Sequence, residues 1–212
     1  AGVFPNQRLR KAFQVLLSED DMMAAAFGEP EFYQVDGSFF PEGYFYHRTD
    51  GIEGNYNMGD IDKAAAILKE EKYDGTPVRI LVSMQYEFHF KIMQVVAEYM
   101  RAAGFKVDMQ VVDWATLTQR RNDPALWDVY ITHSPFVADP VLNNFLNDNA
   151  PGWWITPEKA EVVQRFNTEP DLAKRAEIYG EVQKLVYEQV PVVKVGNFNL
   201  LSARSKNMRG YT

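Results

Sequence analysis

Between residues 77 and 133 the hydrophobic pattern alternates between two periods, and this alternation constrains the fold more than any other feature of the chain. Pro77–Ser83 is a run of aliphatic residues, and Phe105–Val112 places apolar side chains at every second position, so both predict strands. Phe90–Ala103 has the apolar period of an amphipathic helix, and Gly104 follows where that helix has to end. A further strand is expected over Trp127–His133.

The remaining central element is a short helix that Asp113 caps and that runs to about Arg121. Strands and helices that alternate in this way are joined by right-handed crossovers and form a parallel sheet. We therefore expect an α/β fold with a mostly parallel sheet flanked by helices. A single domain over residues 1–212 is expected, because no internal repeat or change in composition marks a boundary.

The flanking regions predict further helices, two closing strands and one long loop. In chain order, the expected elements are two consecutive helices within Asn6–Phe27, a helix from Asp60 to about Lys72, a helix that Thr156 caps, a helix from Thr168 to about Glu188, and strands over Pro191–Val195 and Phe198–Ala203. Glu31–Gly59 mixes aromatic residues with glycine and proline at no regular spacing, which predicts an ordered loop that packs through its rings.

Charge and residue usage exclude several classes of function. The chain has 22 Lys and Arg against 29 Asp and Glu, so its net charge of −7 disfavours nucleic acids and anionic membrane surfaces as partners. It has no cysteine, which excludes disulfides, thiol nucleophiles and cysteine-ligated metals. The three histidines, at positions 47, 89 and 133, lack metal-binding spacing, and no nucleotide-binding or hydrolase motif occurs. We expect no metal, no cofactor and no catalytic residue.

The loops that follow the predicted parallel strands are where a ligand would bind, because ligands of α/β sheets lie beyond the carboxyl ends of the strands. These loops are Ser83–His89, Asp113–Trp114 and Thr132–Asp139. Their candidate residues are Met84, Gln85, Tyr86, Glu87, His89, Trp114, His133, Ser134, Phe136 and Asp139. This mixture suits a polar organic ligand with apolar parts. Trp114 either forms an aromatic wall of the site or fills the interface between sheet and helix.

Several stretches resemble, in the correct order, the C-terminal lobe of the peptide-type solute-binding proteins that serve ABC importers (the dipeptide, oligopeptide and nickel group). The matching stretches are Arg8–Phe13 with Ser18–Asp21, Asp60–Leu68 with Tyr73–Gly75, Val107–Thr116, Trp127–Val129 with Asp139–Pro140 and Phe145–Leu146, and Val190–Val193 with Met208–Thr212. Together they extend over nearly the whole chain.

The resemblance implies a periplasmic-binding-protein-like lobe without enzymatic activity. It implies that residues 1–212 are the single C-terminal ligand-binding lobe of a longer two-lobed periplasmic protein whose N-terminal lobe is absent here. Such a protein captures a peptide or similar small solute between its lobes and delivers it to an ABC permease in the membrane. The partners expected from the resemblance are therefore the solute, the permease and the other lobe.

The resemblance also assigns individual residues to the binding cleft. It places Trp114 in the cleft, with Arg121 further along the same helix, His89 in the first cleft loop, and Thr132, His133 and Ser134 at a strand end. Peptide-binding members carry an aspartate for the ammonium group of the peptide where this chain has Phe136 or, with a slip of one residue, Val137.

A buried ammonium group without a carboxylate is costly. A peptide ligand therefore needs a charge from Glu87 or from the other lobe. A blocked peptide, a sugar-like compound or another small solute fits equally well.

Two other functions are open on the sequence alone. An α/β enzyme, such as a hydrolase, would use Asp113 or Glu87 together with His89 or His133, and it requires a nucleophile and a base within hydrogen-bond reach. A protein-interaction module would require an exposed apolar patch, for which Phe32–Tyr46 is the candidate.

Overall fold

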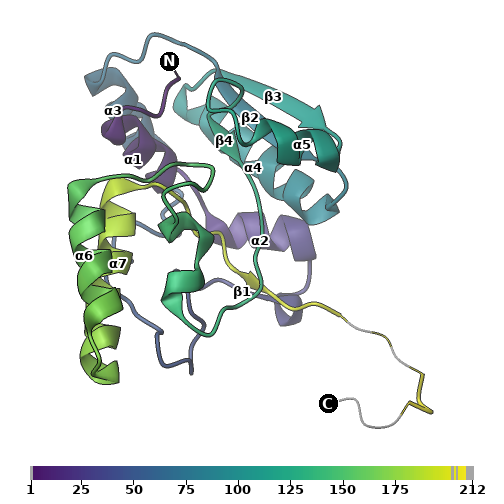
Figure 1. The fold of residues 1–212 in the computed structure, drawn as a ribbon. Coiled ribbons are helices and arrows are strands. Elements are labelled where there is room, and N and C mark those ends of the chain that lie inside the picture. Colours follow the sequence, from purple (N-terminus) through teal and green to yellow (C-terminus); the bar gives the residue numbers. More distant parts are fainter. Residues whose placement is uncertain (1, 202, 204, 209–212) are drawn as a thin grey trace.

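A three-stranded parallel sheet forms the centre of the fold (Figure 1). The computed structural model describes residues 2–201, 203 and 205–208. Strands β2 (Val78–Ser83), β3 (Val107–Val112) and β4 (Val129–Tyr130) lie in the order β3-β2-β4, and both pairings are parallel. The α/β fold and the parallel sheet predicted from the sequence are confirmed.

The central strand, β2, is covered on both faces. Its residues alternate between the faces, so Ile80 and Val82 join the core with α4 (Glu87–Ala103), whereas Leu81 points to the face on which α5 (Trp114–Arg120) packs. Unbroken apolar runs of this kind are typical of strands buried on both faces. The last strand, β4, is shorter than the expected Trp127–His133, because only Val129 and Tyr130 pair with β2.

The helices before and within the sheet region follow the predicted pattern. They are α1 (Gln7–Val15), α2 (Glu19–Phe27), α3 (Ile61–Glu70), α4 and α5. The side chains of Ser18, Asp60 and Asp113 accept hydrogen bonds from the first turns of α2, α3 and α5. Helix α4 begins at Glu87, three residues before the predicted Phe90, and therefore contains His89 in its first turn.

Helices α6 (Pro157–Thr168) and α7 (Leu172–Gln189) lie together at one side of the molecule, away from α5 (Figure 1). Thr156 caps α6 as predicted. The prediction that Thr168 begins the next helix is wrong, because Thr168 ends α6 and Asp171 caps α7. Pro170 explains the break, since a residue that precedes proline is disfavoured in helical conformation. No helix in the described part of the chain is long and apolar enough to cross a membrane.

The closing strands differ most from the prediction. Pro191–Val195 forms no strand, and Asn197–Phe198 (β5) pairs antiparallel with Tyr33–Gln34 (β1), which lies inside the expected loop after the short helix η1 (Pro30–Phe32). Of the predicted strand Phe198–Ala203, only Phe198 is in a strand, and residue 202 lies outside the described residues. Residues 209–212 of the last matching stretch also lie outside them.

The described residues build two hydrophobic cores. The first joins the sheet to α1–α4, and the second joins α6 and α7 to the aromatic loop. In the second core the ring centroid of Phe40 lies 5.4 Å from that of Tyr179, and Tyr46 lies 6.1 Å from Phe166. The ordered, ring-packed loop predicted from the sequence is therefore confirmed. Lys11 of α1 links the two cores, because its Nζ donates a hydrogen bond to the carbonyl of Tyr187 on α7 at 2.6 Å.

An ion pair fixes the start of β4 against β2. The side chain of Asp128 is only 4% exposed and accepts hydrogen bonds from Arg79 N at 2.9 Å and from Arg79 Nε at 2.8 Å. Because β4 leads directly into the loop that begins at Thr132, this pair also determines where that loop starts.

Replacing Asp128 by alanine should lower the free energy of unfolding by about 3 kcal/mol, because it leaves Arg79 partly buried without its partner. Urea unfolding followed by circular dichroism measures the change. The matched control is Glu181→Ala, which removes an exposed ion pair with Arg165 and should cost less than about 1 kcal/mol. Equal losses in the two variants would contradict the assigned role of Asp128.

Candidate ligand-binding site

The carboxyl ends of the three parallel strands bring together aromatic and imidazole rings from three loops. Tyr86 follows β2, Trp114 begins α5 after β3, and His133 follows β4. The Tyr86 ring lies 4.9 Å from Trp114 and 4.8 Å from His133, both in edge-to-face contact. The sequence-based expectation that these loops meet at one edge is therefore confirmed.

Two histidines from different elements contact each other within this group. His89, in the first turn of α4, is 1% exposed, and its Nε2 lies 3.2 Å from Nδ1 of the exposed His133. Burial, and secondarily the neighbouring His133, lowers the pKa of His89 to about 4. Burial also lowers the pKa of His133. Both imidazoles are thus neutral near pH 7, which allows one ring to donate the hydrogen bond and the other to accept it.

Two phenylalanines that the sequence analysis did not select complete the group. Phe88 lies 4.5 Å from His89 and 5.4 Å from His133, and Phe198 of β5 lies 5.9 Å from His133. Phe88 stands inside a candidate loop, so its position was a usable signal. No sequence pattern near Phe198 predicts that it joins this group, because the pairing of β5 with β1 brings it there. We call the six residues Tyr86, Phe88, His89, Trp114, His133 and Phe198 the strand-end cluster.

Trp114 lies on the surface of this cluster and not in the interface between sheet and helix. Its ring is half-buried, 6.1 Å from His89 in a stacked arrangement, whereas Leu117 of the same helix is fully buried. Leu117 therefore fills the helix interface. The cluster thus has a buried base at His89 and a rim that is open to solvent at His133 and at the exposed neighbours Thr132 and Ser134.

Three further candidates lie around this rim or beyond it. Gln85 is exposed, and its backbone N–H donates to Ser83 Oγ at 3.2 Å. Arg121 follows the last residue of α5, at the opposite end of that helix from Trp114, and its carbonyl accepts from Trp127 Nε1 at 3.1 Å. Within the described residues, its buried Nε has no hydrogen-bond partner. Phe136 is 47% exposed and packs on Tyr44 at 5.8 Å instead of on the cluster.

Asp139 lies apart from the cluster, at the second core. Its carboxylate pairs with the guanidinium of Arg175, at 3.0 Å for one oxygen, and also accepts from Val141 N at 3.0 Å. Although burial opposes the change, these hydrogen bonds lower the pKa of Asp139. Asp139 therefore caps a local turn, and its partner on α7 is the contact that sequence reasoning missed.

The side chains named for an enzymatic site are engaged with other partners. Glu87 pairs with Lys91 at 2.9 Å, and Asp113 accepts from Thr116 N at 2.9 Å. His89 bonds to His133 and not to a carboxylate. In the described part of the chain, these residues therefore assemble no pair of nucleophile and base.

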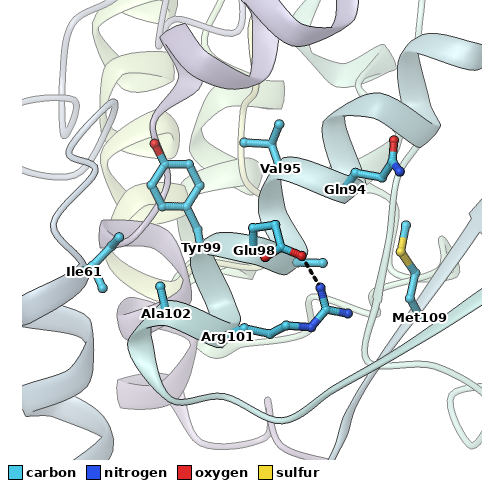
Figure 2. Close-up of a pocket in the computed structure, with 9 residues that line it drawn as sticks. Ile61, Gln94, Val95, Glu98, Tyr99, Arg101, Ala102 and Met109 are labelled. Carbon is cyan, nitrogen blue, oxygen red and sulfur yellow. Dashed lines mark hydrogen bonds and ion pairs between the residues drawn. The ribbon is translucent and has the colours of Figure 1, made fainter.

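The aromatic loop named for an interaction surface is mostly internal. Phe39, Phe40 and Tyr46 belong to the second core or pack against it, whereas Tyr44 and Phe45 are 52% and 56% exposed. An open hollow of about 850 Å³ lies elsewhere, between α3, the solvent side of α4 and β3 (Figure 2). Its lining comes mainly from the middle and the end of α4, which carry the Glu98–Arg101 ion pair, and not from the first turn that carries His89.

Two solved structures of binding proteins share the fold of this chain. The ABC transporter substrate-binding protein CtaP of Listeria monocytogenes superposes with a TM-score of 0.81 at 18% identity, over 92% of this chain and 41% of that protein. The periplasmic EDTA-binding protein EppA superposes with a TM-score of 0.79 at 17% identity, over 93% of this chain and 40% of that protein.

The sequence identifies the family. The profile of the bacterial extracellular solute-binding proteins, family 5 (middle region), matches residues 1–153, and the chain belongs to this family. A curated relative in Sinorhizobium fredii, named "Probable peptide ABC transporter periplasmic-binding protein y4tO", is 25% identical over 98% of this chain. The chain spans 41% of the length of that relative.

The buried His89 should make the stability of the protein depend on acid. Because its pKa is about 4 in the folded state and near 6.5 in the unfolded chain, the unfolded chain takes up the proton first as the pH falls. Between about pH 7 and pH 4.5 the wild type should lose about 2 kcal/mol of stability relative to His89→Gln. Urea unfolding of both proteins at each pH measures the difference.

The difference between the two proteins isolates His89 from other titrating groups. Burial raises the pKa of Glu19 to about 8, above its value in the unfolded chain. Glu19 therefore lowers the stability of the folded protein as the pH rises toward 8, which is opposite to the effect of His89. This contribution is the same in both proteins and cancels. A constant difference from neutral to acidic pH would show that His89 is not held neutral.

Proposed function

We propose that this chain is the C-terminal lobe of a two-lobed, extracytoplasmic solute-binding protein of an ABC importer. The protein captures a peptide or similar small solute between its lobes and delivers it to a permease in the membrane. The strand-end cluster carries this proposal, because it offers an aromatic surface with a polar rim at the edge where α/β sheets bind ligands. The family, and the peptide transport named for the Sinorhizobium relative, support it.

The cluster suits a ligand with apolar and polar parts. The rings of Trp114 and Tyr86 pack against apolar groups, and burial of such groups contributes about 25 cal/mol per Å². The polar rim, formed by Gln85, Thr132, His133 and Ser134, orients the ligand through hydrogen bonds. Arg121, after the end of α5, and Phe136, which packs on Tyr44, are the proposed outer contacts of the solute.

The rigid base of the site keeps the rim in place before a ligand arrives. The hydrogen bond between His89 and His133 joins α4 to the loop after β4, and Asp139 holds the far end of that loop to Arg175. The proposed role of Asp139 is therefore to position the loop. A preorganised half-site of this kind needs little ordering when a second lobe closes over the ligand.

Replacing Trp114 by alanine should weaken solute binding by the full-length protein at least about tenfold, because the ring supplies much of the exposed aromatic surface. Stability should fall by less than about 2 kcal/mol, since the side chain is only half-buried. Native mass spectrometry of the full-length protein first identifies the solute that co-purifies, and isothermal titration calorimetry then measures its affinity.

The matched control is Trp153→Ala, because Trp153 is also half-buried but stacks on Trp127, at 6.0 Å and outside the cluster. This variant should bind the solute as the wild type does. Equal loss of affinity in both variants, or a stability loss of about 3–5 kcal/mol for Trp114→Ala alone, would assign Trp114 to the core instead.

The second lobe should contribute much of the affinity. Residues 1–212 expressed alone should bind the same solute at least about a hundredfold more weakly than the full-length protein, because about half of the contacts are missing. Calorimetry on both proteins measures the ratio, after circular dichroism has established that the shorter one is folded. Equal affinities would refute binding between two lobes.

A further inference from the structure

The hydrogen bond between His89 and His133 has a direction, and this direction decides which group His133 offers to a solute. Nε2 of His89 lies 3.2 Å from Nδ1 of His133, and a neutral imidazole carries one N–H and one lone pair. Burial lowers the pKa of both rings, so both are neutral near pH 7. One ring therefore donates and the other accepts. On each ring, the second nitrogen carries the group that the first does not.

The second nitrogen of His89 lies in an apolar environment. His89 is 1% exposed, and within the described residues its buried Nδ1 has no hydrogen-bond partner. The ring centroids of Tyr86, Phe88 and Trp114 lie 5.3, 4.5 and 6.1 Å from that of His89. In folded proteins a buried N–H without a partner is rarer than a buried acceptor without one. Nδ1 of His89 therefore carries the lone pair, and its Nε2 carries the proton.

This direction fixes the group that His133 turns away from His89. Because Nδ1 of His133 accepts from His89, the proton of the neutral His133 ring is on Nε2. His133 is exposed to solvent, whereas His89 is buried. In the part of the chain that the structure describes, the bond to His89 is the one hydrogen bond that the His133 side chain makes. Its Nε2–H is therefore available to donate to a solute.

We propose that Nε2–H of His133 is a specificity-determining donor of the strand-end cluster, and that His89 is the positioning residue that holds His133 in this form. The cluster then takes a solute that places an acceptor oxygen, such as that of a carbonyl or carboxylate group, beside its aromatic rings. A donor of the solute would meet another N–H at this position instead of a lone pair. The inference rests on the solute-binding function proposed above and concerns which group of the solute meets His133.

One weak interaction predicts the reverse direction. An N–H on His89 Nδ1 that pointed at the ring of Phe88, 4.5 Å away, would form a hydrogen bond to its π electrons. His133 would then donate from Nδ1 and turn a lone pair outward, and the cluster would take a solute donor. Hydrogen bonds to aromatic rings are second-order contributions, so we expect the direction from His89 to His133.

Nitrogen NMR distinguishes the two directions without any solute. The full-length protein, labelled with isotopically enriched histidine and dialysed free of small molecules, should show a proton on Nε2 and none on Nδ1 of both rings near pH 7. The variants His89→Gln and His133→Gln assign the signals. A proton on Nδ1 of either ring would overturn the inference and leave the solute-binding function standing.

Two side chains of nearly the same shape separate the donor of His133 from its bond to His89. In both His133→Gln and His133→Glu a side-chain oxygen can accept from His89, but only glutamine also supplies an N–H for the solute. The probe is the compound that native mass spectrometry finds bound to the purified full-length wild type. Calorimetry should show this compound binding to His133→Gln at least about tenfold more tightly than to His133→Glu.

Ser134→Asp is the control for charge, because it adds a carboxylate at the next exposed position. It should weaken binding of the same compound less than His133→Glu does. Equal affinities of the two His133 variants, or an equal loss in Ser134→Asp, would refute the donor role of His133. A wild type that carries no compound, and binds none from an extract of small metabolites, would instead contradict the solute-binding function itself.

The positioning role of His89 is read from the His133 ring. His89→Leu removes the donor, so His133 should show a mixture of its two neutral forms in the nitrogen spectrum. His89→Gln keeps an N–H for Nδ1 of His133 and should restore the form with the proton on Nε2. A His133 spectrum that is the same in His89→Leu as in the wild type, with circular dichroism showing a folded protein, would refute this role.

Discussion

The parallel pairing of β2 with both β3 and β4 is the constraint on which the rest of the molecule depends. It places three carboxyl ends at one edge of the sheet, so residues that are far apart in the sequence meet there. Tyr86, Trp114 and His133 come together for this reason. The Arg79–Asp128 pair stabilises this arrangement, because only two residues of the short strand β4 pair with β2 and the ion pair adds a further link between the two strands.

The second core supports the same edge from a distance. The loop after β4 leaves the sheet at Thr132, crosses to α7, and is held there where Asp139 pairs with Arg175. The guanidinium of Arg175 also stacks over Phe166 at 4.1 Å, so the anchor of the loop is built into the packing of α6 and α7. The aromatic loop, which has no regular secondary structure over most of its length, fills the space between these helices and the rest of the chain. Both cores therefore contribute to the position of His133.

The sequence was sufficient where the signal is local. The strand periods, the caps at Ser18, Asp60 and Asp113, and the rule for strand ends predicted the sheet and the meeting of three loops. It was insufficient where the signal is weak or remote. The start of α4 was missed because Tyr86 makes no capping hydrogen bond with its side chain, and Phe198 was missed because β5 finds its partner more than 160 residues earlier in the chain. Likewise, no pattern indicates that Arg175 is the partner of Asp139.

We place the bound solute at the strand ends and not in the hollow between α3, α4 and β3. Hydrogen–deuterium exchange of the full-length protein, with and without its co-purified solute, distinguishes the two sites. Slower exchange is expected at residues 84–89, 113–117 and 132–137 in the presence of solute. Slower exchange confined to residues 94–102 of α4, with the strand-end loops unchanged, would contradict this placement.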